Sequence, residues 1–137
     1  MAETKGKWFN YMLDRNQDWL LKELVKPGEK VLHAITDCRI KDISPGKSQR
    51  SPVGVFVATD KRVIFCIPKI SGESHVEEFS YDQITSIGLC RTPYWSGCVD
   101  FTAGPVKKTA FWINPKSNAE EMVRIIRDQV KMLKDKA

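Results

Sequence analysis

The residues of this chain best suited to acid–base or nucleophilic chemistry are two histidines and four cysteines. A catalytic thiol needs a base within hydrogen-bond reach, and that base is most often a histidine. His33 alternates with Val31 and Ile35 in an apolar run, which favours a hydrogen-bonded structural histidine over a base. The chain also lacks the G-x-S-x-G, H-E-x-x-H and glycine-rich nucleotide-binding patterns. We therefore predict a protein that is not an enzyme. The alternative is a cryptic enzyme in which Cys90 or Cys98 meets a histidine in space.

The cysteines do not have the spacing of a metal site. A structural zinc site usually contains two closely spaced ligand pairs, whereas no two cysteines here form a C-x-x-C pair. Each cysteine lies in an apolar stretch with strand character. The sequence therefore predicts free thiols packed as small hydrophobic side chains, with no metal and no cofactor, and metal binding is the alternative. The four residues are Cys38, Cys66, Cys90 and Cys98.

Basic residues gather around a polar segment, residues 41–52. Arginine and lysine suit phosphate groups by charge, and arginine adds a two-pronged geometry. This segment is therefore a candidate surface for anionic lipid, and the alternative is a solvated loop whose charges maintain solubility. Residues 44–48 are not a phosphate-binding loop, because the glycine spacing and the strand-to-helix context are missing. The basic residues are Arg39, Lys41, Lys47 and Arg50.

Two groups of aromatic side chains are candidate contact surfaces. Trp95 lies in a predicted loop, residues 92–97, where it can anchor at a membrane interface or fold back over the sheet. The N-terminal stretch can dock on its own domain, contact another copy of the chain or lie on a membrane, because so much apolar surface rarely stays exposed. The N-terminal residues concerned are Trp8, Phe9, Tyr11 and Met12.

The composition is that of one globular domain. The chain has 137 residues, of which 42% are hydrophobic and 28% are charged. The net charge of +5 is modest and spread along the chain, and no nucleic-acid-binding motif is present, so we do not expect nucleic acid as a partner. No apolar run has the length of a signal or a membrane span, so we expect a cytoplasmic protein that can be peripheral at the membrane.

The hydrophobic pattern predicts a mainly β domain over residues 28–137, preceded by a helical segment over residues 1–27. Turn residues divide the middle of the chain into seven short strands. A final helix after Asn114-Pro115 carries an apolar stripe at spacings of three and four, from Ala119 to Leu133. Seven antiparallel strands make two sheets or a partly open barrel, and such a helix can close one open end. The strands are expected over residues 30–40, 53–59, 62–67 and 74–80, near 84–91, and around 99–103 and 109–113.

Three segments in this order resemble the YokE-like bacterial pleckstrin-homology (PH) domain family. They are Gly28-Glu29 before the first strand, the hairpin from Gly54 to Phe65 with its G-x-x-x-x-T-D-x-R core, and Phe79 to Ile84 with Ile87. The resemblance covers about residues 20–134. It implies a PH-like fold of two nearly orthogonal sheets with a C-terminal helix closing one end. It does not imply a ligand, since a fold alone does not fix function. Within the hairpin, the residue types favour a turn role for Asp60 and local pairing for Arg62.

The sequence thus predicts a non-catalytic binding or adaptor module. The first hypothesis is association with a protein partner, or with itself, through sheet edges or the N-terminal segment. The second is peripheral binding to anionic membrane through residues 41–52. The resemblance implies this site, because in PH domains that bind lipid the loop between the first two strands supplies the basic side chains. Salt separates the two, because it screens charge-led contacts but leaves apolar association in place.

Overall fold

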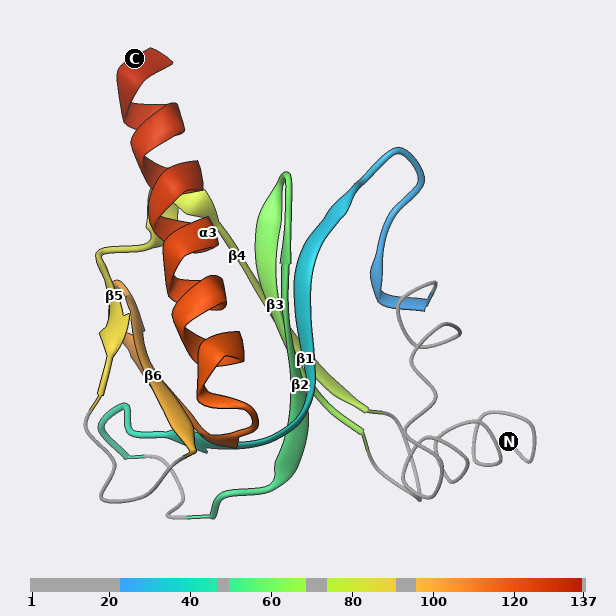
Figure 1. Ribbon diagram of the computed structural model, residues 1–137, viewed down its shortest axis with the longest axis vertical. Helices are drawn as coiled ribbons and strands as arrows, with labels where there is room; N and C mark the ends of the chain where they lie inside the picture. Colours follow the sequence, from blue (N-terminus) through green and yellow to red (C-terminus); the bar gives the residue numbers. More distant parts are fainter. Residues whose placement is uncertain (1–22, 47–49, 69–73, 91–95, 137) are drawn as a thin grey trace.

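The computed structural model describes residues 23–46, 50–68, 74–90 and 96–136. Within these ranges the chain forms seven strands, a short 3-10 turn and one long helix (Figure 1). The predicted N-terminal helix falls mostly on residues 1–22, which lie outside the described residues, so the division at residue 27 stays a prediction. The elements are β1 (Val31–Asp42), β2 (Val53–Thr59), β3 (Arg62–Ile67), β4 (His75–Ser80), η1 (Tyr81–Gln83), β5 (Ser86–Leu89), β6 (Gly97–Ala103), β7 (Val106–Ile113) and α3 (Lys116–Lys136).

The seven predicted antiparallel strands are confirmed, and they form one continuous sheet in the order β4-β3-β2-β1-β7-β6-β5, so the two predicted sheets are joined. The reason is the length of β1. Its first part, from Val31 to Arg39, pairs with β2, and its last part, from Arg39 to Asp42, pairs with β7. Two register shifts along β1 let the strand bend, because a bulge increases local twist. One strand therefore belongs to both halves of the sheet.

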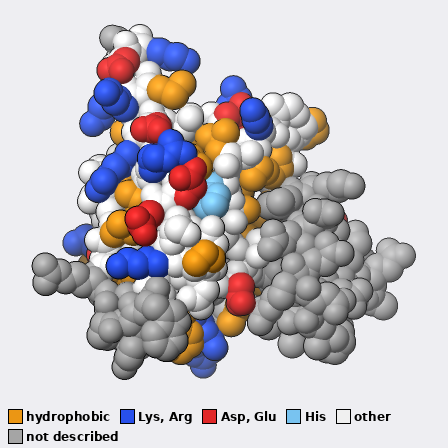
Figure 2. Space-filling view, viewed as in Figure 1, with side chains coloured by type: hydrophobic (Ala, Val, Ile, Leu, Met, Phe, Trp, Pro, Cys, Tyr) orange, Lys and Arg blue, Asp and Glu red, His pale blue; other side chains and the backbone are white. Residues whose placement is uncertain are grey.

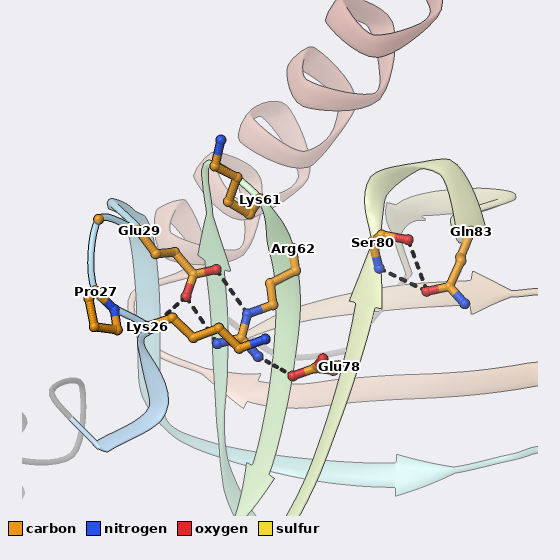
Figure 3. A pocket seen from close by; sticks show the side chains of 9 residues that line it. Lys26, Pro27, Glu29, Lys61, Arg62, Glu78, Ser80 and Gln83 are labelled. Atoms are coloured by element: carbon orange, nitrogen blue, oxygen red, sulfur yellow. Dashed lines mark hydrogen bonds and ion pairs between the residues drawn. The ribbon is translucent and has the colours of Figure 1, made fainter.

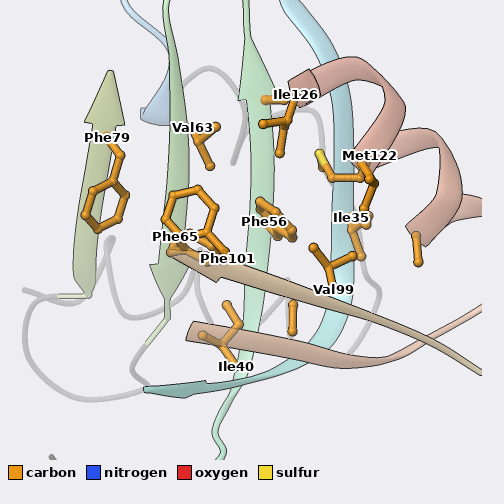
Figure 4. Close-up of a cluster of buried hydrophobic side chains, with 14 of the residues drawn as sticks. Ile35, Ile40, Phe56, Val63, Phe65, Phe79, Val99, Phe101, Met122 and Ile126 are labelled. Atoms are coloured by element: carbon orange, nitrogen blue, oxygen red, sulfur yellow. The ribbon is translucent and has the colours of Figure 1, made fainter. Parts of the chain in front are cut away.

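The main core lies between the sheet and α3. Phe65 stacks on Phe56 with ring centroids 4.6 Å apart and meets Phe101 edge-on at 5.0 Å, and all three side chains are almost fully buried (Figure 4). The helix contributes residues at spacings of three and four that point into this cluster. These residues are Ala119, Met122, Val123 and Ile126. Burial of such side chains contributes roughly 1.5–3 kcal/mol each, so this face holds α3 in place.

The apolar stripe of α3 is shorter than predicted. Leu133, which the periodicity placed in the stripe, is 43% exposed, whereas Met122 is fully buried. Figure 1 shows why: α3 crosses the sheet between the β5–β6 side and the β1–β2 side, and its C-terminal turns run on past the strands. The last turns therefore have no sheet beneath them.

Strands β2 and β3 are buried on both faces. A second cluster, made of Val55, Val57, Ile64 and Cys66, lies on the face away from α3, and Leu24 packs against it. The continuous apolar run of residues 53–58 is typical of a strand that is buried on both faces. Both faces of this hairpin are therefore buried.

Candidate functional site

The signature hairpin forms a buried ion-pair network at one end of the sheet. Arg62 is surrounded by oxygen acceptors: its Nε lies 2.9 Å from one Glu29 carboxylate oxygen, and its Nη2 lies 3.0 Å from the other and 2.8 Å from the Leu24 carbonyl. Glu78 of β4 also pairs with the guanidinium (Figure 3). Only 10% of the Arg62 side chain and 3% of the Glu29 side chain are exposed. The family motif thus ties together three segments that are distant in sequence.

The electrostatics of this network are those of a structural pair. The hydrogen bond from Arg62 lowers the pKa of Glu29 from 4.5 to about 2, against the opposing effect of burial. Thr59 supports the same carboxylate, since its hydroxyl donates to Glu29 at 2.7 Å. Asp60 accepts the backbone N–H of Lys30 at 2.9 Å, which fastens the turn to the start of β1. Arg62 therefore pairs with a residue 33 positions earlier, and the predicted local pairing is wrong.

A hollow of about 470 Å³ lies over this network, between Lys26, Lys61 and Gln83. Its central cation, Arg62, is already neutralised by two carboxylates. Even if an anionic ligand displaced the half-exposed Glu78, the Glu29 carboxylate, which is 3% exposed, would still neutralise Arg62. The hollow is therefore a poor candidate for anion binding despite its basic residues.

The predicted basic surface around residues 41–52 is only partly available. Arg39 donates to the Ser51 carbonyl at 3.1 Å and lies over the Trp112 ring at 5.5 Å. Lys41 is half-buried in β1, Arg50 is exposed, and Lys47 lies outside the described residues. The structure thus brings Arg39 and Lys41 onto one strand but commits Arg39 to contacts within the protein.

A buried lysine next to this surface, Lys108, is neutralised by two carboxylates. Lys108 is 2% exposed, and its Nζ lies 2.7 Å from a Glu77 oxygen and 3.2 Å from an Asp42 oxygen. Burial raises the pKa of both carboxyl groups, but hydrogen bonds outweigh it. Bonds from Ser44 and Lys108 lower the pKa of Asp42, and bonds from Lys108 and His75 lower the pKa of Glu77. Lys108 therefore acts as a cross-strand link between β7, β4 and the end of β1.

The exposed tryptophan of the described residues is Trp112, which sequence reasoning assigned to a regular strand. Gly97 pairs with Ile113 and Cys98 pairs with Phe111, so Trp112 is the extra residue of a bulge, with φ of 58° and 57% exposure. The bulge also changes the faces of β7, because Ala110 and Ile113 are both buried, although regular alternation along a strand would place them on opposite faces. The predicted contact residues Trp95, Trp8, Phe9, Tyr11 and Met12 lie outside the described residues.

The two ends of the sheet differ in how their edge strands are protected. Edge strands usually avoid unwanted pairing by carrying charges. The outer strand β4 carries His75, Glu77 and Glu78. The other outer strand, β5, has the sequence SIGL and carries no charge, and Leu89 is 49% exposed. The edge formed by β5 is therefore the one suited to pairing with another chain.

A groove of about 480 Å³ runs between β5 and α3. Ile84, Ile87 and Val130 give it an apolar lining. The Nη2 atom of Arg127 donates to the Ile87 carbonyl at 3.2 Å. That carbonyl faces away from β6, because the N–H of Cys90 donates to the Cys98 carbonyl at 3.0 Å and successive residues of a strand point to opposite sides. The outward backbone groups of β5 therefore belong to Ile87 and Leu89.

The helix side of the groove is basic. Arg127, Lys131 and Lys134 follow each other at spacings of four and three, which places them on one face of α3. Figure 2 shows basic side chains along the length of α3, with acidic ones interspersed. Asp135 is the one acidic residue lining the groove in the described part of the chain. This surface was not predicted from the sequence, although the spacing of its three cations is visible there.

One cysteine prediction is half wrong. Cys90 and Cys98 form a disulfide with Cα atoms 5.2 Å apart, which joins the end of β5 to β6. The hydrophobic pattern could not show that these residues are cross-strand neighbours. Cys38 and Cys66 are free and buried as predicted, and burial raises the pKa of their thiols to about 12 and about 11. Neither thiol is therefore a ready nucleophile.

His33 also differs from its prediction as a hydrogen-bonded residue. Its Nε2 atom is buried and has no hydrogen-bond partner among the described residues. His75, in contrast, is exposed on β4 and lies 3.0 Å from a Glu77 oxygen. The two histidines thus lie in different surroundings. No group of three potential metal ligands gathers within the described ranges.

The sheet order, the shared β1 strand and the single C-terminal helix define a PH-like fold. The bacterial PH domain family matches residues 25–128, and the chain belongs to this family. The fold is similar to that of the Vps36 N-terminal PH domain, with a TM-score of 0.58 at 12% identity over 80% of this chain and 84% of that one. It is also similar to the PH domain of USP37, with a TM-score of 0.52 at 15% identity over 75% of this chain and 96% of that one. No curated protein sequence matches the chain.

Membership of this family defines the general role. PH domains are in general non-catalytic binding modules for proteins or lipids. No helix in the described part of the chain combines the length and the apolar character needed to span a bilayer. The identity to the solved structures is low, so the likeness to them concerns the fold.

Proposed function

We propose that this chain is a non-catalytic protein-binding module whose partner docks along the outer edge of β5. One observation carries the proposal: β5 is an uncharged edge strand whose outward carbonyl, at Ile87, is bound by a side chain rather than by a neighbouring strand. An extended segment of a partner can add to such an edge through main-chain hydrogen bonds, and pockets beside it supply specificity.

The opposite edge supports the choice by contrast. On β4, Glu77 and Glu78 are already used in ion pairs with Lys108 and Arg62, so a partner strand there would disturb the network that holds the hairpin. On β5, a partner would have to displace one hydrogen bond, from Arg127, which is an exposed residue. Strand addition at β5 therefore disturbs much less of the existing structure.

The proposal is tested with peptides selected from a random library displayed on phage. Leu89→Pro removes one outward N–H, and an edge strand tolerates proline where the N–H faces solvent. We expect this variant to keep its melting temperature within a few degrees and to bind the selected peptides about tenfold more weakly, since main-chain bonds at the edge are lost. Hydrogen exchange at the Leu89 amide should slow when peptide is bound. Peptide binding that is indifferent to Leu89→Pro would contradict docking at β5.

The competing hypothesis is peripheral binding to anionic membrane. It is favoured by the position of the exposed Trp112 beside Arg39, at the base of the segment that carries Arg50. The same preparation is therefore floated with anionic and with neutral vesicles at low and high salt. The membrane hypothesis predicts flotation with anionic vesicles only, which salt weakens and Arg50→Glu/Trp112→Ala abolishes. If this result is obtained and no peptides are selected, the membrane hypothesis replaces the protein-binding proposal.

A further inference from the structure

The chemistry of the β5–α3 groove restricts the kind of segment that can occupy it. One wall is the edge of β5, with outward backbone groups at Ile87 and Leu89. The floor is apolar, and the other wall is the basic face of α3. A ligand that satisfies both walls must offer main-chain hydrogen bonds on one side and negative charge on the other. This inference rests on the proposed function, because it concerns the same edge.

The cations of this wall have no carboxylate partner among the described residues. Arg124, one turn earlier, is paired with Glu121 and Asp128, so it is not part of the free positive charge. Lys131 and Lys134 are exposed and take part in no ion pair within the described ranges. The charge of the groove therefore remains available to a ligand.

We propose that the groove binds an extended acidic peptide segment, which adds to β5 as an eighth strand and places its acidic side chains against α3. The geometry of the two elements sets the spacing of the acidic residues. Arg127 and Lys131 are four residues apart on the helix, which is about 6 Å along its axis. Alternate residues of a strand are about 6.6 Å apart and point to the same side. The ligand is thus expected to carry Asp or Glu at alternate positions.

The intervening side chains of the ligand point to the opposite face of the added strand. On β5 that face carries only the small residues Ser86 and Gly88, because Leu89, which is 49% exposed, lies on the same face as Ile87. The Cys90–Cys98 disulfide fixes the end of β5 on β6, so the edge is held in an extended form before the ligand arrives. An edge that is already ordered loses less conformational freedom on binding. The groove is therefore preorganised for one linear, alternating segment.

The test uses random peptides of about twelve residues, long enough to extend past the short β5 strand at roughly 3.3 Å per residue. After selection on the wild-type protein, we expect Asp and Glu to be enriched at alternate positions relative to the unselected library. One enriched peptide is then synthesised with a fluorophore, and its Kd is measured by anisotropy. We expect Lys131→Glu/Lys134→Glu to raise the Kd about tenfold, and added salt to weaken binding of the wild type.

The matched control reverses two exposed lysines outside the groove, Lys107→Glu/Lys116→Glu, which changes the net charge by the same amount. We expect this control to change the Kd by no more than about twofold, because Lys116 lies about 16 Å along the helix axis from Arg127, and because β6 separates Lys107 from β5 by about one screening length. Equal melting temperatures of the two variants and the wild type show that the effect concerns binding.

The outcomes separate this inference from the function on which it rests. In one outcome, the selected peptides bind Leu89→Pro more weakly but show no enrichment of Asp and Glu. In another, they bind Leu89→Pro more weakly but bind Lys131→Glu/Lys134→Glu as tightly as the wild type. Either result leaves docking at β5 in place and overturns the proposal of an acidic ligand. Peptides that bind regardless of Leu89→Pro overturn both. A failure to select any peptide, with or without flotation on anionic vesicles, also overturns both.

Discussion

Two arginines of this chain show how differently the same side chain is used in two regions of one domain. Arg62, in the signature hairpin, is buried between Glu29 and Glu78 and makes a further bond to the Leu24 carbonyl. Arg127, in the β5–α3 groove, is exposed and donates a hydrogen bond to the Ile87 carbonyl. The first arginine is neutralised by the protein itself. The second keeps its charge at a surface where a partner can use it.

The comparison teaches that a recognisable motif and a binding surface need not coincide. The T-D-x-R hairpin is what makes the chain identifiable, and its residues are engaged in holding β1, β2, β3 and β4 together. The groove has no motif, only an uncharged strand and three cations on a helix face. We therefore expect the hairpin to serve stability and the groove to serve binding.

The largest effect is expected from truncating the two arginines in turn. Arg62→Ala leaves the nearly buried Glu29 without its partner, and breaking a buried pair in this way costs about 3–5 kcal/mol. Arg127→Ala removes one exposed hydrogen bond and should cost no more than about 1 kcal/mol. Urea unfolding of both variants measures the difference. Similar losses of stability in the two variants would break the comparison.

The second-largest effect is expected from acid, which should weaken the hairpin but not the groove. The pKa of Glu29 is about 2 in the folded protein and near 4.5 when its partners are lost, so its contribution is present above about pH 4.5 and disappears as pH falls towards 2. A difference of this size corresponds to about 3 kcal/mol. Unfolding free energies measured between pH 6 and pH 2 should therefore fall steeply in the wild type, with pH values chosen to bracket this window.

Glu29→Gln provides the control for the acid effect. This variant has no carboxylate to titrate at the hairpin, so its stability should be lower at neutral pH and should decline less on acidification. Lys131→Glu/Lys134→Glu, in the groove, should follow the wild-type curve closely at neutral pH, because substitutions of exposed charges usually change stability by less than about 0.5 kcal/mol. A wild-type curve that stays flat down to pH 2 would contradict the assignment of Glu29.

The elements that depend on the local hydrophobic pattern could be predicted from the sequence. The alternation of apolar residues and the turn residues predicted the seven strands and the C-terminal helix, because burial on one face imposes a period of two or of about 3.6 residues. The pattern failed where the third dimension decided the outcome. Leu133 has the correct period but lies beyond the edge of the sheet, and the bulge at Trp112 shifts the inward face of β7 by one residue.

The candidate site was less predictable for the same reason. Ile87 and Arg127 are 40 residues apart, and only the closure of α3 over the sheet brings the strand carbonyl to the guanidinium. The basic residues around the segment 41–52 attracted attention because they are close in sequence, yet Arg39 is used internally. Which edge of the sheet is charged and which is uncharged could be known only once β4 and β5 were found to be the outer strands.

Loss of the disulfide at the β5 edge should lower stability less than Arg62→Ala or the protonation of Glu29. The hairpin region is held by an ion pair, which acid weakens, whereas β5 is held to β6 by the Cys90–Cys98 disulfide, which a reductant opens. Because the crosslink closes a loop with a sequence separation of only 8, its removal in Cys90→Ser/Cys98→Ser should cost about 2 kcal/mol. Urea unfolding with and without reductant measures this loss.

The reductant supplies its own control, since it should lower the stability of the wild type to that of Cys90→Ser/Cys98→Ser and leave the variant unchanged. Cys38 and Cys66 are free thiols already, so a reductant has no bond to break there. Opening the crosslink should also weaken peptide binding at β5, because the edge strand then has to be ordered by the ligand. If the double variant binds peptide as tightly as the wild type, the disulfide stabilises the domain but does not preorder β5 for binding. The binding region then differs from the hairpin only in the residues that line the groove.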